Sequence, residues 1–97
     1  MIRSFKNKGT EDIFYGRSTK AARKVCPMVL WNVASRKFDQ LDSVTSLTDL
    51  SVPPKNMVEA LKNDRLGQYS IRINNQYRIC FKWIDSGPDE VEIVDYH

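Results

Sequence analysis

The chain has 97 residues, of which 41% are hydrophobic and 28% charged, and its formal net charge is +3. This length suits one domain, and the residue balance is that of a globular protein rather than a disordered chain. No apolar run approaches the roughly 20 residues of a membrane-spanning helix, and the first residues lack the apolar stretch of a signal peptide. We therefore expect a single domain over residues 1–97, located in the cytoplasm and not bound to a membrane. The mild positive charge is compatible with a polyanionic partner.

Side chains that bind metals are scarce in this sequence. The cysteines, Cys26 and Cys80, lie far apart among apolar residues, and His97 is the only histidine. Neither a zinc-site spacing nor the cysteine density of a disulfide scaffold is present. We expect reduced thiols in the core, no metal and no cofactor.

The first half of the sequence predicts helices after one short strand. The expected elements are a strand over residues 2–5, helices over 10–15, 20–25 and 30–42, and a helical turn over 46–50. Thr10 is placed to cap the first helix, which would end at Gly16. Pro27 either kinks the second helix or begins the third. The third helix is predicted by apolar residues spaced three and four apart from Leu30 to Leu41.

In the second half of the sequence, apolar and polar residues alternate with a period of two. The expected elements are a strand over residues 57–61, a turn over 63–67, a hairpin over 69–83, a turn over 85–89 and a strand over 90–96. Between Tyr69 and Trp83 most odd-numbered residues are apolar and most even-numbered residues are polar. This alternation is typical of antiparallel strands with one face exposed to solvent. Helices first and an antiparallel sheet afterwards predict an α+β domain with its helices on one face of the sheet.

The length of the hairpin loop decides which side chains share a face. A two-residue loop would pair Ile71 with Arg78 and place an arginine among the apolar side chains. A three-residue loop, Asn74-Asn75-Gln76, keeps the isoleucines and tyrosine together, and asparagine tolerates the left-handed conformation that such loops need. This register places Arg72 directly opposite Arg78.

Two opposed arginines repel each other, at a cost on the order of 0.2–1 kcal/mol. Because a guanidinium group presents forked donors that match phosphate oxygens, Arg72 and Arg78 together predict a phosphate site. Lys62 and Arg65, in the preceding turn, would add positive charge. The pattern alone leaves an alternative open, in which these arginines and Lys82 form an ordinary solvated sheet face.

The segment EALKNDRLGQYSIRINNQYR, from Glu59 to Arg78, together with the following ICFKW and the terminal VEIVDYH, resembles the HigB toxins. These proteins, also called plasmid-maintenance killer proteins, are a branch of the RelE-like toxin superfamily. The initial MIRSF, the helix that ends near LDSVTSLTDL and the PPKN loop match as well, so the resemblance covers essentially the whole chain. It implies the RelE-like, microbial-ribonuclease-type fold, in which N-terminal helices pack on a curved antiparallel β-sheet.

The resemblance also implies a function. The chain would be the toxin of a bacterial type II toxin–antitoxin system, an endoribonuclease that cuts messenger RNA in the decoding site of the small ribosomal subunit. Its partner would be a HigA-type antitoxin with a helix-turn-helix domain, through which the toxin reaches operator DNA.

Carried over by position, the resemblance implies catalytic roles for five residues: Lys62, Arg78, Asp95, Tyr96 and His97. Three further basic residues are candidates for binding RNA phosphates: Arg65, Arg72 and Lys82. Some members of the family place a histidine in the segment matched by Glu59-Ala60-Leu61, where this chain has a glutamate. Either Glu59 takes over part of the proton transfer, or that function is dispensable here.

RNA is cut without a metal when its own 2′-hydroxyl attacks the adjacent phosphorus, which requires proton transfer and stabilisation of the phosphorane charge. Arg78, with Arg72 or Lys62, suits the charge-stabilising role. His97 is the natural proton-transfer group, because histidine titrates near neutral pH.

Two neighbours of the histidine have roles that the sequence leaves open. Asp95 is either a base or the group that orients His97, and Tyr96 positions the ribose or stacks on a base. Strict alternation places Tyr96 on the arginine side of the sheet and Asp95 and His97 on the other, unless a bulge reverses the order. Two alternatives need no catalysis: a basic RNA- or ribosome-binding module, and a module that only docks an antitoxin.

Overall fold

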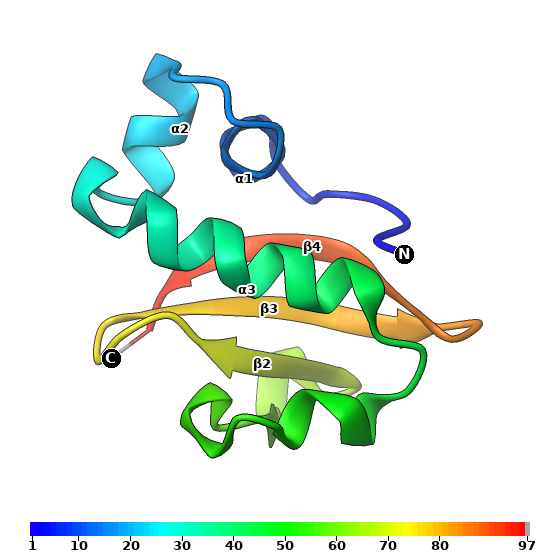
Figure 1. Cartoon of the computed structure of the whole chain (residues 1–97). Helices are drawn as coiled ribbons and strands as arrows, with labels where there is room; N and C mark the ends of the chain where they lie inside the picture. Colours follow the sequence, from blue (N-terminus) through cyan, green and yellow to red (C-terminus); the bar gives the residue numbers. More distant parts are fainter. Residues whose placement is uncertain (97) are drawn as a thin grey trace.

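The computed structural model describes residues 1–96, in which helices cover one face of a four-stranded antiparallel sheet (Figure 1). The helices and strands are α1 (Lys8–Phe14), α2 (Lys20–Val25), α3 (Trp31–Ser43), β1 (Glu59–Ala60), β2 (Gln68–Arg72), β3 (Tyr77–Ile84) and β4 (Gly87–Asp95). Short 3-10 helices span Met28–Leu30, Leu47–Ser51, Pro54–Asn56 and Asn63–Arg65. Sheet order follows chain order, β1-β2-β3-β4. This is the α+β arrangement that the order of elements predicts.

Helix α1 begins earlier than predicted, because its N-cap is Asn7 and not Thr10. The Asn7 side chain accepts a hydrogen bond from the Thr10 N–H at 2.9 Å, which satisfies a free donor of the first turn. Thr10 itself is fully buried, and its hydroxyl accepts a hydrogen bond from the Ile93 N–H of β4 at 3.1 Å. The threonine therefore joins the helix to the sheet instead of capping it.

The strand predicted over residues 2–5 is reduced to a single bridge between Phe5 and Val91, parallel to β4. The Arg3 N–H reaches the Pro88 carbonyl and the Val91 N–H reaches the Ser4 carbonyl, but Glu90 lies between them at φ 49°. This left-handed residue displaces β4 where the pairing would otherwise continue, so the ladder is interrupted.

The carboxylate of Asp12 joins α1 to α2. Asp12 is fully buried and accepts hydrogen bonds from the Thr19 hydroxyl at 2.7 Å, from Lys8 Nζ at 3.1 Å and from Arg17 Nη1 at 3.2 Å. The Thr19 hydrogen bond, followed by those of Lys8 and Arg17, lowers the pKa of Asp12 against the opposing effect of burial. The folded state therefore favours the ionised form.

Replacing Asp12 with asparagine is expected to lower the free energy of unfolding at neutral pH, by an amount that shrinks in acid. Because the folded pKa lies below the ordinary 3.8, the stabilisation is complete above that value and is lost as the pH falls through the folded pKa. Urea unfolding between neutral pH and about pH 2.5 measures the difference. Asp39→Asn, an exposed carboxylate on α3, is the control. A gap between Asp12→Asn and the wild type that does not change with pH would contradict this role.

Helix α3 presents its apolar side chains to the sheet. Ala34, Phe38 and Leu41 are fully buried and belong to the same cluster as Ile71 of β2 and Ile79 of β3. Pro27 follows the C-cap of α2 and precedes the 3-10 turn that leads into α3, so it lies between two helices and does not kink one. The predicted amphipathic helix is confirmed.

The hairpin between β2 and β3 has the predicted register. Ile71 pairs with Ile79 and Arg72 pairs with Arg78. Asn74 lies at the start of the loop, and its side chain accepts hydrogen bonds from the N–H groups of Gln76 and Tyr77 at 2.9 and 2.7 Å. These contacts hold the three-residue loop that the parity of the sequence requires.

Two other strands differ in length from the prediction. The turn before β4 consists of Asp85 and Ser86, at φ 49° and 66°, so β4 already begins at Gly87. This is the tight left-handed turn that suits a twisted hairpin. Strand β1 is shorter than predicted, and Met57, at its predicted start, has a φ of 47°, which is outside strand geometry. No helix within residues 1–96 is long and apolar enough to span a membrane.

Candidate active site

The sheet face that points away from α3 contains the predicted site. It is called the arginine face below, and its paired residues include Ser70, Arg72, Arg78, Cys80, Glu92 and Val94. Its centre is largely shielded from solvent, since Ser70 and Cys80 are fully buried and Arg78 is only 7% exposed. The prediction of a wet face is therefore wrong at this point, and so is the alternative of a solvated Arg78. The chain from Met57 to Arg65 folds back over the sheet and contacts Arg78 and Glu92.

Arg78 is held by neutral groups. Its Nε donates to the Ser70 hydroxyl at 2.7 Å, and Nη2 donates to the Met57 carbonyl. The guanidinium carbon lies 5.9 Å from the centre of the Tyr96 ring, within the range of a cation–π contact. No carboxylate among residues 1–96 forms an ion pair with Arg78. A buried cation without a counter-ion is costly, so the arrangement favours an anionic ligand.

Arg72 lies opposite Arg78 and is also held by neutral groups, but it is more exposed. Its Nη1 is 3.1 Å from the Met57 sulfur, and Nη2 contacts the Asn75 side-chain oxygen. Within the described chain it too has no ion pair. Met57, whose φ is 47°, thus contacts both arginines, one through its carbonyl and the other through its sulfur.

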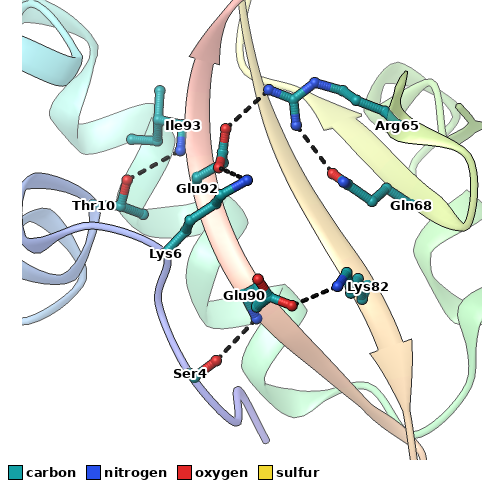
Figure 2. A network of polar contacts seen from close by, with 9 residues as sticks. All are labelled: Ser4, Lys6, Thr10, Arg65, Gln68, Lys82, Glu90, Glu92 and Ile93. Carbon is teal, nitrogen blue, oxygen red and sulfur yellow. Dashed lines mark hydrogen bonds and ion pairs between the residues drawn. The ribbon is translucent and has the colours of Figure 1, made fainter. Parts of the chain in front are cut away.

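Arg65 and Lys82 differ from this pair, because each has a carboxylate partner on β4 (Figure 2). Arg65 donates to Glu92 and to Gln68, both at 3.0 Å. Lys82 Nζ lies 2.6 Å from Glu90, and this hydrogen bond, together with the charge of the carboxylate, raises the pKa of Lys82. Both predicted phosphate ligands are thus largely neutralised within the protein.

Glu92 is a residue that sequence reasoning missed. Its side chain points between Arg65 and Lys6, with Lys6 Nζ at 3.4 Å (Figure 2). It thereby ties both the N-terminal segment and the turn at Asn63–Arg65 to β4. The one available signal was a carboxylate at an alternating position between two buried apolar residues of the last strand. Lys62 directly precedes this turn, is exposed and forms no ion pair within residues 1–96.

The last strand divides the remaining candidates between the two faces. Asp95 pairs with Tyr77 and receives a hydrogen bond from Gln76 at 3.2 Å, so it lies on the face opposite Arg78. Tyr96 lies on the arginine face, as alternation predicts. Glu59 pairs with Ser70 and is exposed at the β1 edge of the arginine face. His97 lies outside the described residues, so its predicted role stays a prediction.

The described side chains offer little for a metal. No group of three or more cysteine, histidine, aspartate or glutamate side chains within residues 1–96 is placed to hold an ion. Both cysteines are free and buried, and burial raises the pKa of Cys26 to about 11 and that of Cys80 above its ordinary value. The thiols are therefore protonated at neutral pH and are poor nucleophiles or ligands.

Both the fold and the sequence of this chain match those of known proteins. Over 100% of its length the chain superimposes on 95% of a chain in the YoeB–YefM complex from Staphylococcus aureus, with a TM-score of 0.61 and 20% identity. Residues 3–97 match the family model of the RelE-like toxins of the type II toxin–antitoxin system HigB, and the chain belongs to this family.

Two relatives cover most of the chain. It is 36% identical over 85 residues to Toxin HigB-1 of Vibrio cholerae serotype O1, an alignment that spans 88% of this chain and 86% of the relative. It is 28% identical to Endoribonuclease HigB of Proteus vulgaris over the full length of both chains. The resemblance and the fold class inferred from the sequence are therefore confirmed.

Proposed function

We propose that this toxin is an endoribonuclease that cuts messenger RNA on the ribosome and thereby inhibits translation. The observation that carries the proposal is Arg78, a nearly buried guanidinium group held by Ser70 and Met57, with no carboxylate partner in the described chain. Arg72 pairs with it in the sheet. The name of the Proteus vulgaris relative, an endoribonuclease, supports the same activity.

In the proposed reaction the RNA supplies its own nucleophile. The 2′-hydroxyl loses its proton to a base and attacks the adjacent phosphorus, the bond to the 5′ oxygen breaks, and that oxygen takes up a proton. The products are a 2′,3′-cyclic phosphate, which water can open to a 3′ phosphate, and a 5′-hydroxyl. Arg78 stabilises the charge on the phosphorane oxygens, and Arg72 and the exposed Lys62 add to the positive field. The Tyr96 ring, beside Arg78, positions the ribose or stacks on a base.

Proton transfer is assigned to the end of the chain and to the β1 edge. His97 is the proposed acid or base, because its ordinary pKa is close to neutral. Strand β4 ends at Asp95, so the alternation that separates the two faces of the sheet need not extend to His97. Asp95 lies on the opposite face, so we assign it the orientation of the terminal residues rather than contact with the phosphate. Glu59, which shares the arginine face and pairs with the serine that holds Arg78, is the second candidate for proton transfer.

The remaining parts of the proposal concern partners and location. Ribosomal RNA would bind the same basic surface, which restricts cutting to messages in the decoding site. A HigA-type antitoxin would neutralise the toxin in the cytoplasm and connect it to operator DNA.

Ribosome dependence is tested by incubating the purified protein with one message, either free or bound to ribosomes, and mapping the cut ends. We expect cuts on the ribosome-bound message only, and growth arrest when the protein is produced without antitoxin. Lys62→Ala is expected to slow the cutting by about 100-fold while the protein stays folded.

The two alternatives give other results. A non-catalytic RNA-binding module would bind ribosomes and leave the message intact, and an antitoxin-docking module would neither bind ribosomes nor cut the message. Either result, obtained with folded protein, would overturn the proposed activity.

A further inference from the structure

A pocket of about 920 Å³ opens beside the arginine face, between α3, the loop at residues 53–57 and the end of β2. Its basic lining residues come from all three segments: Arg36, Lys37, Lys55 and Arg72. No aspartate or glutamate of the described chain lines it. The pocket is therefore a concentration of positive charge without internal compensation, and it complements an anion.

A buried amide outside the pocket lining holds two of the lining side chains, Lys37 and Gln40. Asn56 is fully buried, and its nitrogen donates to the side chain of Gln40 and to the carbonyl of Leu50, both at 2.9 Å. Its oxygen accepts a hydrogen bond from Lys37 Nζ. These hydrogen bonds fix the lysine at the pocket wall before any ligand binds.

The cationic side chains of the pocket also repel one another. Burial, and after it the like charges of Arg36 and Lys55, lower the pKa of Lys37. An anion that enters the pocket would reduce this repulsion, because it attracts all of the cations around it.

Two residues, Arg72 and Met57, connect the pocket to the arginine face. Arg72 and Met57 line the pocket, and the Met57 carbonyl oxygen accepts a hydrogen bond from Arg78. A strand that places one phosphate at Arg78 can therefore continue past Arg72 into the pocket without leaving a basic surface.

We propose that this pocket binds a backbone phosphate of the same RNA strand, at least one nucleotide from the bond that is cut. The identity of the ligand rests on the proposed function, whereas the basic pocket does not.

The test uses the double variant Arg36→Gln, Lys55→Gln. Both side chains are exposed and have no hydrogen bond or ion pair within the described chain, so the fold is expected to persist. The matched control is Arg23→Gln, Lys24→Gln, which removes the same charge from the exposed last turn of α2. Thermal melts followed by circular dichroism verify that both proteins are folded.

The probe is a fluorescein-labelled single-stranded RNA of about ten nucleotides, 2′-O-methylated throughout so that it cannot be cut. Fluorescence anisotropy over a range of salt concentrations gives the affinity. We expect the pocket variant to bind roughly tenfold more weakly, with a slope of log K against log salt smaller by about 0.7 for each phosphate that the protein no longer neutralises. The control is expected to stay close to the wild type.

Equal loss of affinity in both double variants would overturn the proposal, since it would reveal only a general charge effect. So would unchanged RNA binding by the pocket variant, including the case in which a polyglutamate peptide binds the wild type and not the variant. If the pocket variant loses affinity while the wild type fails to cut message on ribosomes, the pocket stands and the proposed activity fails.

Discussion

Replacing Arg78 with glutamine is expected to slow the cutting of ribosome-bound message by about 100- to 1000-fold. The substitution removes the charge at the centre of the arginine face and keeps a polar side chain that can still donate to Ser70 or Met57. Because this cation has no carboxylate partner within residues 1–96, its charge is available to the phosphorane oxygens. Single-turnover cutting on saturating ribosomes measures the effect.

Two further proteins make this result specific. Arg23→Gln, on the exposed face of α2, removes the same charge far along the chain from the site and is expected to cut at the wild-type rate. Arg78→Lys restores the charge but not the forked donors, so it is expected to recover only a small part of the activity. A folded Arg78→Gln protein that cuts nearly as fast as the wild type would contradict the assignment of this arginine.

Replacing Phe38 with alanine is expected to lower the free energy of unfolding by about 3–5 kcal/mol. Phe38 is fully buried where α3 meets the sheet, and its ring centre lies 5.9 Å from that of Phe14 and 6.4 Å from that of Phe5. The cavity left by the ring would weaken the packing of α1, α3 and the N-terminal segment together. A domain of this size has a total stability of about 5–15 kcal/mol, so much of it would disappear. Urea unfolding at equilibrium gives the difference.

An exposed apolar residue provides the control for this measurement. Val29→Ala, at a side chain that is 86% exposed, is expected to change the free energy of unfolding by less than about 0.5 kcal/mol. If Phe38→Ala cost no more than Val29→Ala, the three aromatic rings would not be the packing centre between the helices and the sheet.

The parts of the site that follow from strand parity could be predicted from the sequence. Side chains alternate along a strand, so one assumption about the loop at residues 74–76 fixed Arg72 opposite Arg78. The same rule placed Tyr96 beside them and Asp95 on the other face. No bulge between β3 and β4 interferes here, because the irregularity in their pairing lies further along, between Cys80 and Lys82.

The parts that depend on distant contacts could not be predicted. Glu92 neutralises Arg65 across 27 positions of the sequence, and Lys37 reaches Asn56 across 19, and no local pattern encodes such pairs. A positive side chain that follows a turn looks the same in the sequence whether or not a carboxylate later folds against it. The sequence therefore does not separate the arginine pair from Arg65 and Lys82, whose charges are balanced by carboxylates in the folded chain.

The N-cap of α1 was predicted wrongly, because two residues near the start of this helix are suited to the role. Asn7 and Thr10 are both good N-cap residues, and the sequence alone does not say which of them the tertiary structure needs elsewhere. The contact with the sheet determines the role of Thr10, because the buried Ile93 N–H requires an acceptor and the Thr10 hydroxyl supplies it. Asn7 is then left to cap the helix.

The central claim is that the arginine face promotes attack by the 2′-hydroxyl of the RNA itself. The most direct measurement replaces the single nucleotide on the 5′ side of a mapped cut with its 2′-deoxy form, in a message bound to ribosomes. We predict that cutting at this bond disappears while a second, unmodified cut site in the same message is still used, and that the normal cuts leave 5′-hydroxyl ends. Cutting at the 2′-deoxy position at the normal rate, or ends that carry a 5′ phosphate, would contradict the claim.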